Sequence, residues 1–213
     1  MSDKKQQKTN SKERILRIAT SLFARKGFAE TGMRELATEA EVNLSMVNYF
    51  FGSKKGLLKE ILDGFLSQYL AIARENLAGK GDLQSRLKRF IAASVNYFEA
   101  ERNSLIITIS ELPHDDPEIV EHKAAWAGQM VEIVNRELCK PHTAETGQYI
   151  PPTCLAPMLT SLMASRFLFG PLMEEVKAGS SKAVSTEDYT KMLVGILLQG
   201  ITGADIKSGE RNI

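Results

Sequence analysis

The stretch TGMRELATEAEVNLSMVNYFFGSK, residues 31–54, decides the fold of this chain. The pair Thr31-Gly32 precedes a short run of apolar residues at helical spacing, which predicts a helix of about two turns. Asn43 then supplies a capping side chain for a second short segment, residues 44–51. The pair Gly52-Ser53 can end that segment and cap the next helix. We therefore expect two short helices joined by a tight turn.

Upstream of this stretch, apolar residues recur at three- and four-residue steps from Ser11 to Gly27, the pattern of an amphipathic helix. Gly27 can adopt the left-handed conformation that ends a helix, and Phe28 can fold back on the last turn. Residues 1–10 are polar and lysine-rich, so we expect a flexible arm there. Residues 11–56 thus have the size of a three-helix helix-turn-helix domain.

The rest of the chain, residues 57–213, is predicted to form a larger helical domain. Apolar stripes at helical spacing cover residues 58–73, 83–100, 104–112, 117–140, 156–177 and 187–201. Loops are expected at residues 141–153 and 178–186, which are rich in Pro, Gly, Ser and Thr. Because no segment alternates like a strand beside a hairpin turn, the predicted fold class is all-α, with about nine helices.

Composition indicates an ordinary globular protein. Hydrophobic residues make up 43% of the chain and charged residues 25%, which suffices for a packed core. Cys139 and Cys154 lack the spacing of a zinc or redox motif, so we expect a reducing, cytoplasmic environment. No signal-peptide pattern follows Met1, and the longest apolar stretch, residues 162–173, is interrupted by Arg166. We therefore expect no export and no membrane span.

Charge is distributed unevenly along the chain. Residues 1–56 hold 11 Lys and Arg against 6 Asp and Glu, whereas residues 57–213 hold 16 against 20. The head therefore carries a net charge of +5 and the remainder −4. This asymmetry is typical of proteins in which only the head meets phosphate, although solvated basic faces are also common.

The amino-terminal region resembles a known family. The pair Gly27-Phe28, the run TGMRELA at residues 31–37, Val42, and the run VNYFFGSK at residues 47–54 resemble the amino-terminal signature of the TetR family of repressors. The resemblance covers residues 11–58, and beyond them only length and helical pattern are similar. It implies a helix-turn-helix that binds operator DNA and a larger helical domain that dimerises and binds a small molecule.

Elementary packing divides the helix-turn-helix residues into a core set and an outward set. An apolar core must hold the recognition helix at a fixed angle while small or polar side chains meet base edges. The expected core residues are Leu36, Ala37, Val42, Val47 and Phe51. The resemblance implies that Ser45 and Asn48 reach bases and that Arg34 reads guanine. The other residues of the set below are expected to contact phosphate or to lie beside the groove. The full predicted DNA-binding set is Thr31, Gly32, Arg34, Asn43, Leu44, Ser45, Asn48, Tyr49 and Lys54.

Three positions depart from the family pattern. Glu41 stands where the family usually has glycine at the turn, so we expect a strained or altered turn and a carboxylate that avoids phosphate. Asn48 replaces a frequent tyrosine, which gives a side chain able to pair with adenine. Phe50 replaces a common histidine, which removes a phosphate donor and leaves a ring that can pack inward.

The last two helices carry more apolar surface than one face requires. Pairing with a second copy would bury this surface in a four-helix bundle, which the resemblance also implies, although internal core is an equally open interpretation. The candidate dimer residues are Leu159, Leu162, Met163, Tyr189, Met192, Leu193, Ile196 and Leu197.

The middle helices offer aromatic and polar residues for a ligand pocket, although each aromatic residue alone is more often part of a core. The candidate pocket residues are Phe65, Tyr69, Tyr97, Phe98, Thr108, Glu111, Trp126, Met130, Arg166 and Phe167. Arg166 could equally serve the dimer interface. The ligand would be a small-molecule inducer of unknown identity.

The sequence offers little support for a metal site or for an enzyme active site. His114, Glu118 and His122 recur every four residues, but Pro117 places His114 before the helix begins, so no metal and no cofactor are expected. HExxH, GxSxG, P-loop and GxGxxG motifs are absent, which argues against an enzyme. We therefore predict a ligand-responsive repressor that binds a palindromic operator as a homodimer. The alternatives are a helical scaffold or small-molecule-binding protein without DNA binding, or an unrecognised enzyme.

Overall fold

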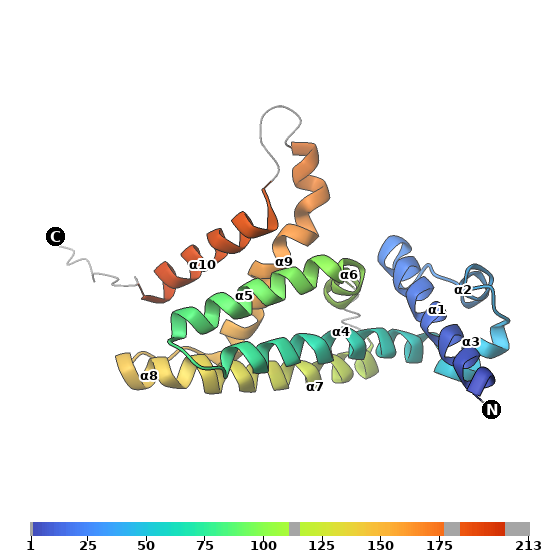
Figure 1. Ribbon diagram of the computed structural model, residues 1–213, viewed down its shortest axis with the longest axis horizontal. Coiled ribbons are helices and arrows are strands. Elements are labelled where there is room, and N and C mark those ends of the chain that lie inside the picture. Colours follow the sequence, from blue (N-terminus) through green and yellow to red (C-terminus); the bar gives the residue numbers. More distant parts are fainter. Residues whose placement is uncertain (1, 111–115, 177–183, 203–213) are drawn as a thin grey trace. The chain divides into compact units, whose positions relative to one another are not determined.

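The computed structural model describes residues 2–110, 116–176 and 184–202, and every regular element in these ranges is a helix. Ten α-helices and one π-helical turn confirm the all-α prediction (Figure 1). They are α1 (Ser2–Lys26), α2 (Met33–Glu39), α3 (Leu44–Phe51), α4 (Lys54–Leu77), α5 (Leu83–Ala100), α6 (Arg102–Ser110), α7 (Pro117–Val134), the π turn η1 (Asn135–Cys139), α8 (Lys140–Thr146), α9 (Pro152–Val176) and α10 (Thr186–Thr202). No described helix has the length and hydropathy needed to cross a membrane.

The chain divides into two compact units. The first comprises residues 1–71 and 98–132, and the second comprises residues 72–97 and 133–213. The first unit contains the whole of the predicted helix-turn-helix region, residues 11–56, together with α6 and parts of α4 and α7.

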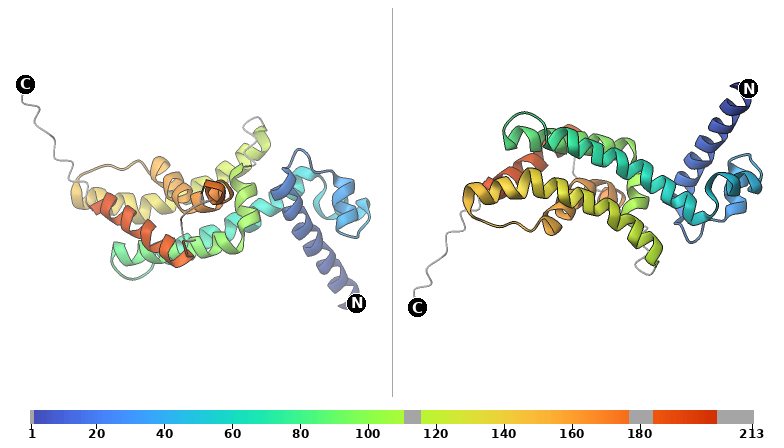
Figure 2. Two further views of the ribbon diagram at one scale, coloured as in Figure 1. Left: turned by 90° about the horizontal axis from the view of Figure 1, so that it is seen from above. Right: turned by 90° about the horizontal axis from the view of Figure 1, so that it is seen from below.

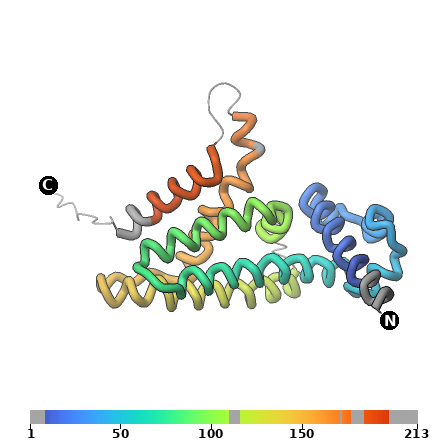
Figure 3. Tube along the Cα trace, viewed as in Figure 1, coloured from blue at the N-terminus to red at the C-terminus, as the bar shows by residue number. Residues whose placement is uncertain are grey.

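Helices α1, α2 and α3 pack around one apolar core in the first unit (Figure 3). As the periodicity predicted, α1 contributes a buried stripe, and α2 and α3 each contribute two side chains. The buried residues of these helices are Ile15, Ala19, Leu22, Phe23, Leu36, Ala37, Val47 and Phe51. Gly27 ends α1 with φ 87°, and the Phe28 ring lies edge-on to Phe23 at 5.3 Å between centroids. The predicted stop signal after α1 is therefore confirmed.

Two helix boundaries differ from the prediction. Helix α1 begins at Ser2 rather than at Ser11, so most of the predicted arm, residues 2–10, is helical. This segment has no glycine or proline, and its lysines and glutamines are good helix formers even without an apolar stripe. The first part of the predicted loop at residues 141–153 is also helical, because α8 continues to Thr146.

The π turn explains how the helix passes a proline. Pro141 occupies the first turn of α8, directly after η1, where the Lys140 N–H donates to the Asn135 carbonyl across a wide turn. A proline cannot donate its nitrogen to the preceding turn, and a π bulge relaxes the requirement for that bond. The composition that predicted a loop therefore produced a locally widened helix instead.

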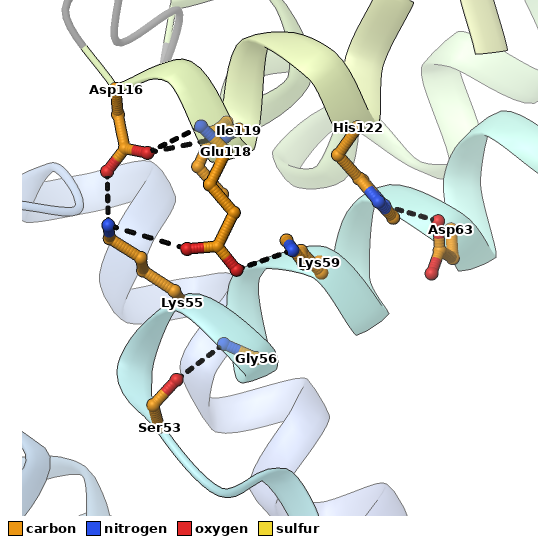
Figure 4. A network of polar contacts seen from close by, with 9 residues as sticks. All are labelled: Ser53, Lys55, Gly56, Lys59, Asp63, Asp116, Glu118, Ile119 and His122. Carbon is orange, nitrogen blue, oxygen red and sulfur yellow. Dashed lines mark hydrogen bonds and ion pairs between the residues drawn. The ribbon is translucent and has the colours of Figure 1, made fainter. Parts of the chain in front are cut away.

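Facing rows of charged side chains join α4 to α7 within the first unit (Figure 4). Lys55 Nζ lies 2.6 Å from Asp116 Oδ2 and 3.6 Å from Glu118 Oε2, and Lys59 Nζ lies 2.7 Å from Glu118 Oε1. We call these four residues the α4–α7 clasp. Hydrogen bonds from the lysines lower the pKa of both carboxyl groups, and Asp116 raises the pKa of Lys55.

One turn further along the same two helices, Asp63 of α4 forms hydrogen bonds with two ring nitrogens of α7. Its Oδ1 lies 2.7 Å from His122 Nε2 and accepts a 2.8 Å hydrogen bond from Trp126 Nε1. Lys55, Lys59 and Asp63 are spaced by four residues and so share one face of α4. A polar row therefore runs along the α4–α7 contact in the first unit, beside the apolar cluster that Ile119 of α7 shares with α4.

Helices α9 and α10 pack against each other in the second unit (Figure 2). The Tyr189 hydroxyl donates to the Leu162 carbonyl at 2.6 Å and lies 3.0 Å from Ser165 Oγ. Arg86 of α5 donates from Nη1 to the Leu77 carbonyl at the end of α4, 2.6 Å away, and the same nitrogen lies 3.4 Å from Glu137 Oε2 of the π turn.

Candidate nucleic-acid interface

The turn between α2 and α3 is closed by two backbone hydrogen bonds around a left-handed residue. Val42 N–H donates to the Ala37 carbonyl and Glu41 N–H donates to the Thr38 carbonyl, each at 3.0 Å, which is the Schellman pattern. Glu41 has φ 51°, the one positive φ outside glycine among the described residues. The prediction of a strained turn at Glu41 is confirmed. Helix α1 also supports the turn, because Arg14 Nη2 donates to the Glu41 carbonyl at 3.2 Å.

Helix α3 is capped as predicted and begins and ends at the predicted residues. Asn43 Oδ1 accepts hydrogen bonds from the Met46 N–H at 2.8 Å and from Ser45 Oγ at 2.7 Å. Gly52 ends the helix with φ 71°. Ser53 Oγ then accepts from the Gly56 N–H at 3.0 Å and caps α4. The amide oxygen of Asn43, predicted to contact DNA, is thus occupied by capping.

The two faces of α3 have opposite character. Val47 and Phe51 are buried in the core, whereas Ser45 and Asn48 are exposed and the Tyr49 side chain is 71% exposed. Leu44 is half-buried and packs against the core, so only part of it remains for a groove. Phe50 also packs partly inward, as expected, with its ring 5.3 Å from that of Tyr49.

The start of α2 is only partly available to DNA. Gly32 caps the helix and is exposed, and Arg34, the second residue of α2, is exposed as well. Thr31, by contrast, is 3% exposed, and its hydroxyl donates to the Gly27 carbonyl at 2.9 Å. The Thr31 hydroxyl therefore stabilises the loop, whereas Gly32, the other predicted phosphate contact at this helix start, is exposed.

Lysines and carboxylates around the motif are largely paired. Lys54 Nζ donates to the Ala29 carbonyl at 3.0 Å and lies 4.6 Å from the centre of the Phe28 ring, so it fastens the start of α4 to the α1–α2 loop. Lys26 pairs with Glu35 and lowers the pKa of that carboxyl group. Because Glu35 is paired, its negative charge is partly neutralised at the start of α2.

The helix-turn-helix region is similar to that of known proteins. The sequence profile described as "Bacterial regulatory proteins, tetR family" matches residues 15–61. Residues 15–61 of this chain therefore form a TetR-family amino-terminal domain. The repressor KstR2 of Rhodococcus jostii, described as HTH-type, is 29% identical over 107 residues, which are 50% of this chain and 52% of KstR2. The HTH-type repressor NicS of Pseudomonas putida is 24% identical over 109 residues, 51% of each chain. The chain thus matches only about half the length of these relatives.

Solved structures extend the likeness in fold to nearly the whole TetR-family chain. The fatty acid degradation regulator FadR of Bacillus halodurans gives a TM-score of 0.69 at 16% identity, covering 92% of this chain and 96% of FadR. The TetR-family regulator PfmR of Thermus thermophilus gives 0.62 at 20% identity, covering 87% and 94%. The matched profile is described as regulatory proteins and both relatives as transcriptional repressors, which agrees with the predicted regulatory function.

Several residues predicted to line a ligand pocket form core instead. Phe65, Tyr69 and Phe98 are buried and pack ring to ring, with centroids 5.0 to 6.5 Å apart. Met130 and Phe167 are also buried. These three rings pack against one another as core, which is the alternative that the sequence analysis left open for each aromatic residue.

The remaining pocket candidates are polar or half-buried. Trp126 donates to Asp63, and the Thr108 hydroxyl donates to the Ser104 carbonyl within its own helix. Tyr97 is half-buried, and Glu111 lies outside the described residues. Arg166 lies with its guanidinium carbon 5.5 Å from the centre of the Tyr189 ring, and its Nη1 is buried with no partner in the described part of the chain.

The predicted dimer residues fall into two sets. Leu159, Met163, Tyr189, Leu193 and Leu197 are buried within the protomer, which confirms the internal-core alternative for them. Met192 and Ile196 are about half exposed and Leu162 is half-buried, so they remain available to a partner. The sequence reading missed other exposed apolar residues, which helical spacing from Leu162 along α9 would have found. These are Phe169, Leu172, Met173 and Val176, and Met158 is exposed as well.

No group of three or more potential metal ligands occurs among the described residues. Glu118 belongs to the α4–α7 clasp, and His122 bonds Asp63. His114 lies outside the described residues.

Proposed function

We propose that this TetR-family chain is a ligand-responsive repressor that binds a palindromic operator as a homodimer and releases it when a small-molecule inducer binds. The relatives KstR2 and NicS are both described as repressors. The alternative of a scaffold without DNA binding does not explain why residues 15–61 match a profile of bacterial regulatory proteins.

The outward face of α3 is the observation that carries the proposal. Its other face is anchored by Val47 and Phe51, so Asn48 and Ser45 are held on a fixed helix in a position to read bases in the major groove. Exposed Arg34 and the Gly32 backbone flank this face from α2 and are proposed to contact DNA as well. Such contacts position the helix on the duplex.

A second copy is proposed to cover the exposed apolar side chains of α9 and α10. Met158, Phe169 and Val176 follow helical spacing on α9, and exposed Met192 and Ile196 lie on α10. One short recognition helix makes few base contacts, whereas two on a palindrome combine their contributions. The dimer therefore supplies both burial of this face and operator affinity.

The inducer is proposed to act through α4. Helix α4 begins at Lys54, directly after the Gly52-Ser53 turn that ends α3, and runs to Leu77. The α4–α7 clasp and Asp63 hold its first half to α7. A ligand that favours a different position of α4 would favour a dimer whose recognition helices no longer match successive grooves.

The test begins with selection of bound duplexes from a random DNA pool by the full-length chain. We expect enrichment of an inverted repeat, with affinity that falls steeply as salt rises because phosphate contacts release counterions. Fluorescence anisotropy on the selected duplex should give Asn48→Ala about tenfold weaker binding, since a bidentate base contact contributes about 1–3 kcal/mol. Gln84→Ala, an exposed amide on α5, is the matched control. Failure to enrich any sequence would support the scaffold alternative.

A further inference from the structure

The π turn, α8 and the segment that follows them line an open surface hollow that none of the predicted sites uses. It has a volume of about 480 Å³ and is lined by Asn135, Cys139, Lys140, Thr143, Tyr149 and Pro152, among others. Pockets for small molecules commonly have volumes of about 300–1,000 Å³. All of these residues belong to the second unit.

A sharp reversal of the chain builds the hollow. Gly147 ends α8 with φ 73°, and its N–H donates to the Thr143 carbonyl at 2.8 Å. Thr143 Oγ1 then donates to the Gln148 carbonyl at 3.0 Å, which holds the returning segment close to α8. The opposite wall comes from that segment, in which the Tyr149 side chain is 72% exposed. A large aromatic ring left this exposed beside a hollow can close over a ligand.

The charge and polarity of the residues that line the hollow indicate which class of ligand it can bind. Lys140 is the only charged residue among the described residues that line the hollow, and no carboxylate lies there to pair with it. Burial raises the pKa of the Cys139 thiol, so that residue contributes an uncharged, apolar wall. Pro152, Ala144 and the Tyr149 ring add further apolar surface. Lys140 therefore gives the hollow a positive charge with which an anion can pair.

We infer that this hollow binds a small organic anion, with its carboxylate at Lys140 and its apolar body between α8 and the Tyr149 segment. The inference rests on the proposed function, because this ligand would be the inducer.

A physical link joins the hollow to α4. Asn135 and Cys139 begin and end the π turn, and Glu137 lies between them. Glu137 Oε2 is 3.4 Å from Arg86 Nη1, which also donates to the Leu77 carbonyl at the end of α4. A ligand that reshapes the π turn would therefore alter the bond that holds the end of α4.

Isothermal titration calorimetry on the full-length chain tests the site with decanoate, decan-1-ol and decylamine. We expect binding of decanoate and neither of the other two. Lys140→Gln should weaken decanoate binding about tenfold, as expected for loss of a charge-assisted hydrogen bond. Ala144→Trp should abolish it by filling the hollow. Lys88→Gln on α5 and Ala127→Trp on α7, both at exposed positions, are the matched controls.

Operator binding supplies an independent readout. Decanoate should weaken operator binding by the wild type, whereas Glu137→Gln should bind decanoate normally and respond less. If the chain binds its operator but calorimetry detects no decanoate, or if Lys140→Gln binds it as the wild type does, this inference is overturned and the repressor proposal survives. If decanoate binds at Lys140 but no operator is found, the site stands and the proposed function fails.

Discussion

Several polar residues of the helix-turn-helix make hydrogen bonds that stabilise the fold. Thr31 bonds the Gly27 carbonyl, Asn43 caps α3, and Lys54 bonds the Ala29 carbonyl. Glu41 is a different case, because its backbone is left-handed while its side chain remains exposed. For an L-residue this conformation is costly, and glycine adopts it freely.

Replacing Glu41 with glycine should therefore stabilise the domain. We expect the free energy of unfolding, measured by urea titration, to rise by about 1 kcal/mol as the left-handed strain is relieved. Operator affinity should also rise, because a carboxylate near phosphate is removed. Glu41→Ala removes the same charge but keeps the strain, so it should improve affinity without the gain in stability. Equal stability of the two variants would contradict this account.

Helix α7 is held to α4 by charges whose ionisation depends on pH. Asp116 has two roles, because Oδ2 pairs with Lys55 while Oδ1 accepts from the N–H groups of Glu118 and Ile119 at the start of α7. The Lys55 hydrogen bond lowers the pKa of Asp116 below its usual value of 3.8. The stabilisation is therefore complete above that value and is lost as the pH falls through the lowered pKa.

Asp116→Asn separates the two roles of this side chain. The amide oxygen can still cap α7, but the charge that pairs with Lys55 is gone. We expect the wild type to lose more stability than Asp116→Asn between about pH 5 and about pH 2, as followed by urea titration at each pH. At pH 7 Asp116→Ala, which loses the cap as well, should be the least stable of the three. If the free energy of unfolding fell equally with pH in the wild type and in Asp116→Asn, the pair of Asp116 and Lys55 would make no contribution.

Helix boundaries were predictable where a cap or a left-handed glycine marks them. Helix α3 begins after Asn43 and ends before Gly52, as the sequence predicted. The prediction failed at Pro141, because a proline signals a break but cannot reveal that a π turn accommodates it. It also failed at residues 2–10, where helix propensity continued α1 without any apolar stripe.

The proposed dimer would depend on apolar residues that a single protomer leaves uncovered. Phe169, Leu172 and Ile196 are each more than half exposed. Exposed apolar side chains gathered on neighbouring helices are typical of an interaction surface. The buried members of the same helices, such as Leu159 and Leu193, serve the protomer core instead.

Phe169→Asp and Ile196→Asp should separate the protomers without unfolding them. We expect the dimer dissociation constant, measured by analytical ultracentrifugation, to rise by about a hundredfold or more, because an unpaired carboxylate is costly to bury. Circular dichroism should remain that of the wild type. Leu159→Asp, at a buried position, should instead lose helicity. An unchanged dimer in both exposed-site variants would place the interface elsewhere.

The helical periods, caps and spacing of residues 11–58 were enough to define the fold class, the helix-turn-helix and its family, because these features act through neighbours a few residues apart. Which apolar side chains would be core and which would be surface depended on contacts between distant segments. Phe65, Tyr69 and Phe98 fill one another's space, and the hollow at the π turn forms only when the chain reverses at Gly147. Local periodicity records that a residue is apolar, whereas packing in three dimensions decides what covers it.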